Sequence, residues 1–165
     1  MGTGKTAVGK LAADHLGLSF IDSDVEIERK SGKTISAIFD QLGEEAFRLM
    51  EKDFILDGHP SHGCLVSCGG GLPIPPGLLD LLKERGRVVA LWASPESIYQ
   101  RTKEDSARPL LQVDDPLGRI TDLLAAREPA YRKAHEIIST EKRSPQAVCE
   151  LLTRYYEEGS LPSDT

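Results

Sequence analysis

A glycine-rich turn at the start of the chain carries residues that could bind phosphate. Gly2-Thr3-Gly4-Lys5-Thr6 leads directly into a segment with helical spacing and matches the C-terminal part of the pattern G-x-x-x-x-G-K-[ST]. In that pattern backbone N–H groups surround an anion, the lysine reaches the terminal phosphates and the hydroxyl ligates Mg²⁺. The turn therefore predicts a phosphate-binding loop, with a surface turn before a helix as the alternative.

Two carboxylates follow the first short apolar run, in the order Asp22-Ser-Asp24. Alternate residues at the end of a strand point the same way, so both could face the edge at which open α/β sheets bind ligands. One carboxylate could hold Mg²⁺ through water, and the other could accept a hydrogen bond from a substrate hydroxyl. The alternative is that an aspartate caps the helix that starts near Val25.

The middle of the chain adds an Arg-Glu pair and a glycine run. Arg48 and Glu51 are predicted to share one face of a helix at positions i and i+3. Ser67, whose hydroxyl could hydrogen-bond a metal-bound water, precedes Gly69-Gly70-Gly71, whose backbone a ligand can approach closely. A surface ion pair and a flexible turn are the plainer interpretations.

Arginines later in the chain could bind further anions. Arg108-Pro109 lies in a charged segment between two predicted helices, and Arg127 lies at the end of a helix. The planar arginine fork pairs with a phosphate or a carboxylate at two points. Arg101, Arg143 and Pro145 are less specific and, taken alone, are typical of an ordinary surface.

Alternating helices and short apolar strands must position these residues. The pattern predicts helices over residues 5–16, 25–30, 35–42, 44–56, 77–84, 96–102, 117–127 and 145–158, with a further helical turn at Pro129. It predicts strands over residues 18–22, 64–67, 87–93 and 136–139. Such alternation is typical of an α/β fold in which helices cover both faces of a parallel sheet.

Composition excludes several classes of protein. The 165 residues include 20 Lys or Arg and 26 Asp or Glu, giving a formal charge of −6, and 39% are hydrophobic. This suits one globular domain and argues against a nucleic-acid binder, while the apolar runs are too short to span a bilayer. The odd number of cysteines, Cys64, Cys68 and Cys149, favours free thiols in a reducing cytoplasm, and their spacing does not indicate a zinc site.

Six segments, taken in order, resemble the shikimate kinase family from residue 1 to about residue 152. They are Gly-Thr-Gly-Lys-Thr, Phe-Ile-Asp-Ser-Asp, Ile-Phe-x3-Gly-Glu-x2-Phe-Arg-x2-Glu, Ser-x-Gly-Gly-Gly, Arg-Pro-Leu-Leu and Arg-x-Pro-x-Tyr. The resemblance implies Mg²⁺- and ATP-dependent transfer of a phosphoryl group to the 3-hydroxyl of shikimate, in the chorismate route to aromatic amino acids. It also implies a P-loop NTPase-type three-layer α/β/α sandwich with a parallel sheet in strand order 2-3-1-4-5.

The resemblance further implies a role for each matching residue. The implied catalytic residues are Lys5, Asp24 and the lid residue Arg108, and the implied Mg²⁺ ligands are Thr6, Asp22 and Ser67. The residues implied to bind ATP are Gly2, Thr3, Gly4, Lys5, Thr6, Ala7, Arg101, Arg108, Arg143 and Pro145. Those implied to bind shikimate are Asp24, Arg48, Glu51, Gly69, Gly70, Gly71 and Arg127.

The same resemblance sets the expected domain boundaries. We expect a single domain over residues 1–158 and, because it is polar, a frayed tail over residues 159–165. The charged segment over about residues 103–115 is expected to be a lid, with a plain solvated connection as the alternative. In the family a central strand and the first loop glycine come before the position of Met1. The free-energy cost of losing a central strand should exceed the roughly 5–15 kcal/mol by which a typical domain is stable. We therefore expect Met1 to be an internal methionine of a longer chain. We also expect a cytoplasmic monomer without nucleic-acid or membrane partners.

Two other interpretations remain open. The first is another small-metabolite phosphate-loop kinase, such as a gluconate or nucleoside-monophosphate kinase, although the glycine run with Arg48 and Arg127 suits a compact polyol that bears a carboxylate. The second is a degenerate domain that binds nucleotide or metabolite without turnover. The incomplete phosphate loop favours the second interpretation, whereas the presence of Lys5, Asp24 and Arg108 argues against it.

Overall fold

The structure is a computed structural model that describes residues 2–103 and 113–159. In chain order its elements are α1 (Lys5–Leu16), β1 (Ser19–Asp22), α2 (Ser23–Ser31), α3 (Ile35–Asp57), β2 (Cys64–Ser67), α4 (Leu78–Arg85), β3 (Val89–Trp92), α5 (Pro95–Thr102), α6 (Pro116–Tyr131), β4 (Glu136–Ser139) and α7 (Pro145–Glu158). Each predicted helix and strand is present, with boundaries that differ by a few residues.

The observed helices differ from the predicted ones at Gly43 and at Pro129. The two helices expected on either side of Gly43 form one element, α3, whose axis is interrupted where Gly43 adopts φ 82° and ψ 170°. The separate helical turn expected at Pro129 is wrong, because α6 continues through Pro129 to Tyr131. The proline is tolerated there since the carbonyl that loses its partner belongs to Ala125, on an exposed part of the helix.

The strands of the described residues form two separate parallel pairs rather than one continuous sheet. β1 pairs with β2 in the register Ser19 to Cys64 and Asp22 to Ser67. β3 pairs with β4 in a register that sets Trp92 opposite Ser139. The pairs correspond to the 2-3 and 4-5 neighbours of the expected strand order. The α/β class and the parallel direction of the strands are therefore confirmed.

An apolar cavity of about 450 Å³ lies between the two strand pairs. β2 and β3 line it along their whole lengths, and side chains of α1, α4 and α6 complete its wall. On the edges that face this cavity, β2 and β3 pair with no other strand in the part of the chain that the structure describes. Strand edges without ladder partners leave backbone N–H and C=O groups that could accept another strand.

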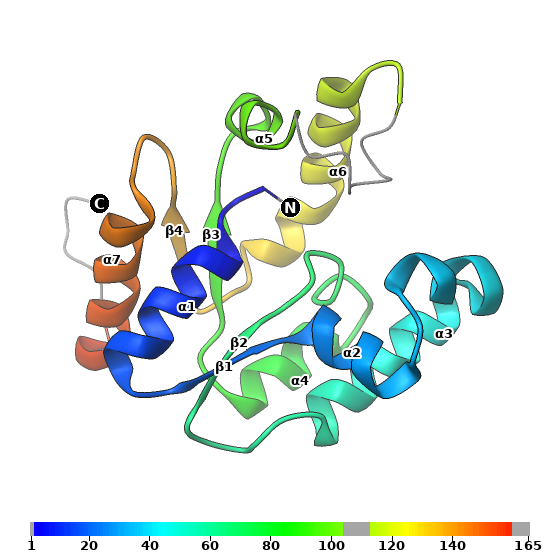
Figure 1. The fold of residues 1–165 in the computed structure, drawn as a ribbon. Helices are drawn as coiled ribbons and strands as arrows, with labels where there is room; N and C mark the ends of the chain where they lie inside the picture. Colours follow the sequence, from blue (N-terminus) through cyan, green and yellow to red (C-terminus); the bar gives the residue numbers. More distant parts are fainter. Residues whose placement is uncertain (1, 104–112, 160–165) are drawn as a thin grey trace.

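The helices divide between the two strand pairs. Figure 1 shows α1 beside α7 on one side of the molecule, with α2 and α3 on the opposite side. Val8 of α1 packs with Ile138 and Val148 in one core, whereas Ile38 and Phe47 belong to a second core under α2 and α3. The cavity is also lined by Thr3 and Lys5 of the phosphate loop and by Gly69 and Gly70 of the glycine run.

The expected lid and the expected C-terminal tail lie mostly outside the part of the chain that the structure describes. The expected lid falls mainly on residues 104–112, and the expected tail on residues 160–165, both outside the described residues. Lys103 caps the C-terminus of α5, and the Asp115 side chain accepts a hydrogen bond from the Gly118 N–H at 2.9 Å to cap α6. Within residues 2–103 and 113–159, no helix is long and apolar enough to cross a membrane.

Candidate active site

The phosphate loop is held in shape by glycine at two positions. Gly2 and Gly4 have φ values of 64° and 86°, a left-handed conformation that favours glycine. A Cβ atom on Gly2 would also lie 2.9 Å from methyl carbons of Ile98 and Thr102 in α5. This turn directs the positive N-terminal end of α1 toward solvent, as anion binding requires.

A second cavity of about 450 Å³ opens at this end of α1. Its lining includes every residue that the sequence assigned to ATP binding and that the structure describes: Gly2, Thr3, Gly4, Lys5, Thr6, Ala7, Arg101, Arg143 and Pro145. Arg108 lies outside the described residues. The cavity therefore brings α1, α5 and the start of α7 around one space that adjoins the loop.

Two arginines of this cavity are fixed by the end of β4. Arg101 donates hydrogen bonds to the hydroxyl and the carbonyl of Thr140, at 2.9 and 2.8 Å. Arg143 donates to the carbonyl of Ser139 at 2.8 Å. Because backbone partners hold both guanidinium groups, they form a positively charged wall for an anionic ligand.

The aspartates at the end of β1 have different environments. Asp22 Oδ1 accepts a hydrogen bond from the Asp24 N–H at 3.1 Å and caps α2, so the capping interpretation is confirmed for Asp22. Burial raises the pKa of Asp24; repulsion from Asp22 adds to the rise and Lys5 opposes it. A carboxylate whose pKa is raised above its ordinary value is a better proton acceptor than an exposed one.

Several charged side chains converge on the end of β2. Asp22 and Ser67 are register partners at the last positions of β1 and β2, and Ser67 is buried. Cys68 follows Ser67 directly, and burial raises the pKa of its thiol to about 12. The charge of Lys5 lowers this pKa, whereas those of Asp24, Glu51 and Asp22 raise it. Lys5 lines the apolar cavity together with Ser67, Cys68 and Gly69, so its side chain lies at the same end of β2. No group of three or more His, Cys, Asp or Glu side chains suited to an all-protein metal site occurs in the described ranges.

Arg48 lies against this cluster with two carboxylate partners. Its Nη1 donates to Glu51 at 2.6 Å, and its Nη2 donates to Glu44 at 2.7 Å. Burial lowers the pKa of Arg48, but the hydrogen bonds to Glu51 and Glu44 outweigh it, and the net shift is upward. Burial raises the pKa of Glu51, with Arg48 opposing the rise.

The glycine run is packed too closely for side chains at two positions. A Cβ atom on Gly69 would lie 2.8 Å from an Asp24 oxygen, and one on Gly71 would lie 2.9 Å from Arg48 Nη1. The Gly69 N–H donates to Ser23 Oγ at 3.0 Å, and that hydroxyl donates to Asp24 at 3.4 Å. The backbone of the run therefore lies directly beside the side chains of Asp24 and Arg48, and the approach of a ligand to it stays a prediction.

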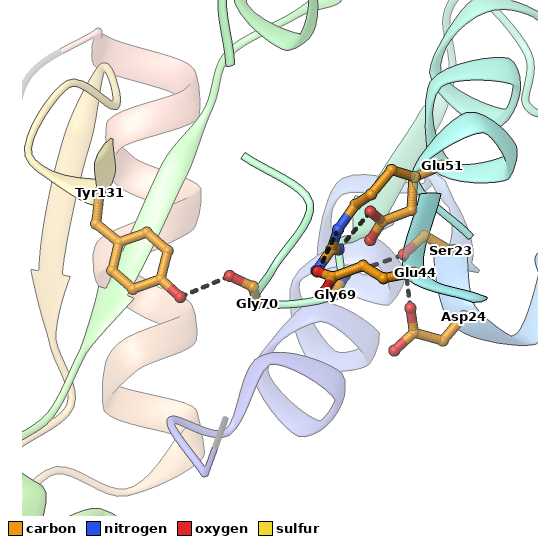
Figure 2. Close-up of polar contacts among 8 residues, drawn as sticks. Ser23, Asp24, Glu44, Glu51, Gly69, Gly70 and Tyr131 are labelled. Carbon is orange, nitrogen blue, oxygen red and sulfur yellow. Dashed lines mark hydrogen bonds and ion pairs between the residues drawn. The ribbon is translucent and has the colours of Figure 1, made fainter. Parts of the chain in front are cut away.

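Tyr131 reaches the same run from the other side. Its hydroxyl donates to the Gly70 carbonyl at 2.6 Å, and Figure 2 shows it approaching opposite to Ser23, Asp24 and Glu51. Burial raises the pKa of Tyr131, while the neighbouring Arg127 lowers it. The C-terminal end of α6 thus carries both Arg127 and the tyrosine that anchors the glycine run.

Comparison with known proteins agrees with this geometry. A family model described as shikimate kinase matches residues 1–157. The chain belongs to the shikimate kinase family. A shikimate kinase of Thermus thermophilus is 48% identical over 151 residues, which cover 91% of this chain and 82% of that protein. The shikimate kinase of Thermodesulfovibrio yellowstonii is 42% identical over 157 residues, which cover 95% of this chain and 91% of that protein.

Solved shikimate kinase structures share the fold. The enzyme from Acinetobacter baumannii in complex with shikimate has a TM-score of 0.88 and 39% sequence identity, covering 98% of this chain and 91% of that one. The enzyme from Aquifex aeolicus has a TM-score of 0.82 and 31% identity, covering 96% of this chain and 93% of that one. These likenesses confirm the P-loop-type α/β fold class.

Three residues of this candidate site were not assigned a role from the sequence. Ser23 lies between two aspartates and is fully buried, and its hydroxyl connects α2 to the glycine run. Glu44 is the exposed partner of Arg48. Tyr131 belongs to the segment Arg-x-Pro-x-Tyr, whose spacing brings Tyr131 one helical turn after Arg127 and could have indicated a shared site.

Proposed function

We propose that this chain catalyses ATP-dependent phosphorylation of the 3-hydroxyl of shikimate, giving shikimate 3-phosphate and ADP. The observation that carries the proposal is that Lys5 of the phosphate loop, the Asp24 carboxylate and the Arg48–Glu51 pair all lie beside the segment that follows β2. A phosphate-binding lysine and a carboxylate with a raised pKa at one point are what phosphoryl transfer to a hydroxyl needs. Membership of the shikimate kinase family supports shikimate as the acceptor.

Shikimate would bind between α3, the glycine run and the end of α6. We assign its carboxylate to Arg48 and Arg127, with Glu51 holding Arg48 in place. Gly69, Gly70 and Gly71 would supply a flat backbone surface for the ring. In a chain of net charge −6, such local cations are needed to attract an anionic substrate.

Asp24 would receive the proton of the attacking hydroxyl. Desolvation of its carboxylate makes it a stronger base than an exposed aspartate, and Ser23 and the Gly69 contact fix its orientation. Lys5 would compensate the charge that develops on the transferred phosphoryl group. We also assign a phosphate-stabilising role to Arg108 in the lid, on the resemblance alone.

The residues available for Mg²⁺ suit that ion. Thr6 is exposed on the phosphate-loop cavity, and Asp22 and Ser67 end neighbouring strands in register. All three offer oxygen atoms, which Mg²⁺ prefers, and few protein ligands suffice because the ion retains waters and phosphate oxygens. When bound, Mg²⁺ would neutralise phosphate charge, and Asp22 would keep its capping bond to α2 while it contacts the ion through water.

The nucleotide would occupy the second cavity. Gly2, Thr3 and Gly4 would surround the phosphates with backbone N–H groups, and Ala7 would continue this surface into α1. Arg101, Arg143 and Pro145 would flank the base. We further propose that residues 1–158 act as one domain, as a cytoplasmic monomer in aromatic amino acid biosynthesis.

An ADP-release assay tests this function. Shikimate, gluconate and nucleoside monophosphates are offered with Mg²⁺ and ATP, and turnover is expected with shikimate alone. Lys5→Met should abolish turnover, whereas Lys10→Met, which changes an exposed lysine of the same helix, should not. Release of ADP with gluconate or a nucleotide instead would identify another kinase, and nucleotide binding without any turnover would identify a non-catalytic domain.

A further inference from the structure

The guanidinium of Arg48 is held by carboxylates along two different edges. Nη1 donates to Glu51 Oε2 at 2.6 Å. Nε and Nη2 both donate to a single oxygen of Glu44, Oε1, at 3.2 and 2.7 Å. The Nε/Nη2 edge is one of the forks with which arginine binds carboxylates. Glu44 therefore holds Arg48 as a carboxylate ligand would.

The two glutamates differ strongly in burial. The Glu51 side chain is 1% exposed, whereas that of Glu44 is 65% exposed. Removing a buried charge from its partner is costly, so Glu51 is a permanent partner of Arg48. An exposed ion pair contributes little free energy, because water can replace either partner. Glu44 is therefore the partner that can leave.

The backbone around Arg48 restricts which edge a ligand can use. A Cβ atom on Gly71 would lie 2.9 and 3.0 Å from Nη1 and Nη2, so the glycine run closes on that side of the guanidinium. Gly43 interrupts α3 directly before Glu44, and a regular helical turn follows that places Glu44 and Arg48 at i and i+4. The kink thus begins the turn that brings the Glu44 carboxylate to the remaining fork, formed by Nε and Nη2.

We propose that Glu44 is a positioning residue that occupies the Nε/Nη2 fork of Arg48 and exchanges with the carboxylate of the substrate. Glu44 keeps the guanidinium oriented and competes with the substrate for it. The affinity for carboxylate-bearing substrates is then set by this exchange as well as by direct contacts. This inference rests on the proposed function, in which Arg48 binds the carboxylate of shikimate.

Calorimetric titration of the full chain with shikimate tests the exchange. Glu44→Gln keeps the shape of the side chain and weakens its bond to Arg48. Because Glu44 competes with the substrate for Arg48, loss of an exposed ion pair of ordinary strength should make shikimate binding about two- to fivefold tighter. KM should fall by the same factor, with kcat little changed. Glu45→Gln, at the neighbouring exposed position, removes the same charge and should leave the affinity unchanged.

A second ligand separates exchange from general charge effects. The carboxamide analogue of shikimate is neutral at this group, so Glu44→Gln should not tighten its binding. Equal or weaker shikimate binding by Glu44→Gln would overturn the inference, as would tightening that also occurs with Glu45→Gln or with the carboxamide. If the unmodified chain binds no shikimate, the proposed function fails together with this inference; if it binds and Glu44→Gln has no effect, only the inference fails.

Discussion

The hydroxyl of Tyr131 donates a hydrogen bond of 2.6 Å to the carbonyl of Gly70, joining the end of α6 to the glycine run after β2. The two residues are far apart in the sequence, and Tyr131 is half-buried, one helical turn after Arg127. The contact fixes a run of glycines whose backbone would otherwise lose much conformational entropy on binding a ligand. Tyr131 therefore orders the surface on which we propose that the shikimate ring lies.

Tyr131→Phe removes only this hydroxyl. We expect KM for shikimate to rise about three- to tenfold with kcat changed by less, because the substitution loosens the binding surface and leaves the reacting groups in place. The free energy of unfolding should fall by about 1 kcal/mol, measured by urea denaturation. Tyr156→Phe, at an exposed tyrosine, is the control. An unchanged KM in Tyr131→Phe would show that the bond serves folding alone.

Gly69 is expected to tolerate no side chain. In Gly69→Ala the new methyl group would lie 2.8 Å from an Asp24 oxygen, so the carboxylate or the loop must move. We expect kcat/KM to fall by at least about tenfold, since a displacement of the base from its working position is costly. Gly86→Ala is a matched control, because its Cβ meets nothing within 4 Å. Equal kinetics for the two variants would contradict the position assigned to Asp24.

Asp24→Asn should separate stability from activity. Burial, chiefly, raises the pKa of Asp24 in the folded protein above its ordinary value of 3.8. Folding therefore disfavours the ionised carboxylate, and stability is lost as the pH rises from about 3.8 through the folded-state pKa. At pH 7 to 8 the asparagine variant is expected to have a higher Tm than the unmodified protein, and below about pH 3.8 the difference should vanish.

The same substitution removes the proposed base. Turnover should fall by about 10²-fold or more. In the unmodified protein, the pH at which kcat/KM falls on the acidic side should be higher than the ordinary pKa of an exposed aspartate. Asp40→Asn, at an exposed position of α3, should change neither the Tm profile nor turnover. Full activity in Asp24→Asn would exclude Asp24 as the proton acceptor.

Arg48→Ala should act on substrate binding rather than on the chemical step. A charge-assisted hydrogen-bonded contact predicts a rise in shikimate KM of about 10- to 100-fold, with kcat within a few-fold. The variant also leaves the buried Glu51 unpaired, so a lower Tm is expected as well. Arg29→Ala, which breaks the pair of an exposed arginine with the half-buried Glu26, is the control. A large fall in kcat at unchanged KM would contradict the assignment of Arg48 to the carboxylate.

The cavity between β2 and β3 predicts a stabilising effect of one added strand. A chain extended before Gly2 by five alternating Val and Ile residues could pair with the edges of β2 and β3 that have no strand partner among the described residues, and bury its side chains in the cavity. Burial of two or three such residues is expected to raise the free energy of unfolding by about 4 kcal/mol or more, and Tm by about 10 °C. Trp92, the single tryptophan, lines the cavity and would report the change by fluorescence.

A proline at the centre of the added strand provides the control. Proline cannot donate to a ladder, so this extension should recover little of the stabilisation. Equal Tm values for the two extended chains, with an unchanged Trp92 emission, would show that the cavity does not accept a strand.

Much of the secondary structure was fixed by local chemistry and could be predicted. Ser94-Pro95 and Ser144-Pro145 start helices as expected, because a capping hydroxyl followed by proline satisfies the first turn of a helix without any tertiary contact. The glycines of the phosphate loop were likewise predictable, since their backbone conformation is a local requirement. Pro129 was misread because solvent exposure, which the sequence does not state, makes a proline tolerable inside a helix.

The sequence by itself determined the types of chemistry available: a phosphate loop, two aspartates after a strand, a glycine run and a set of arginines. Only the tertiary structure decided which of these groups meet. The contact of Gly69 with Asp24 and that of Tyr131 with Gly70 join residues distant in the chain, and no local preference specifies such pairs. The pairing of β1 with β2 and of β3 with β4 follows the strand order that the family resemblance implied, and strand propensity alone would not have specified it, because pairing depends on which edges come together.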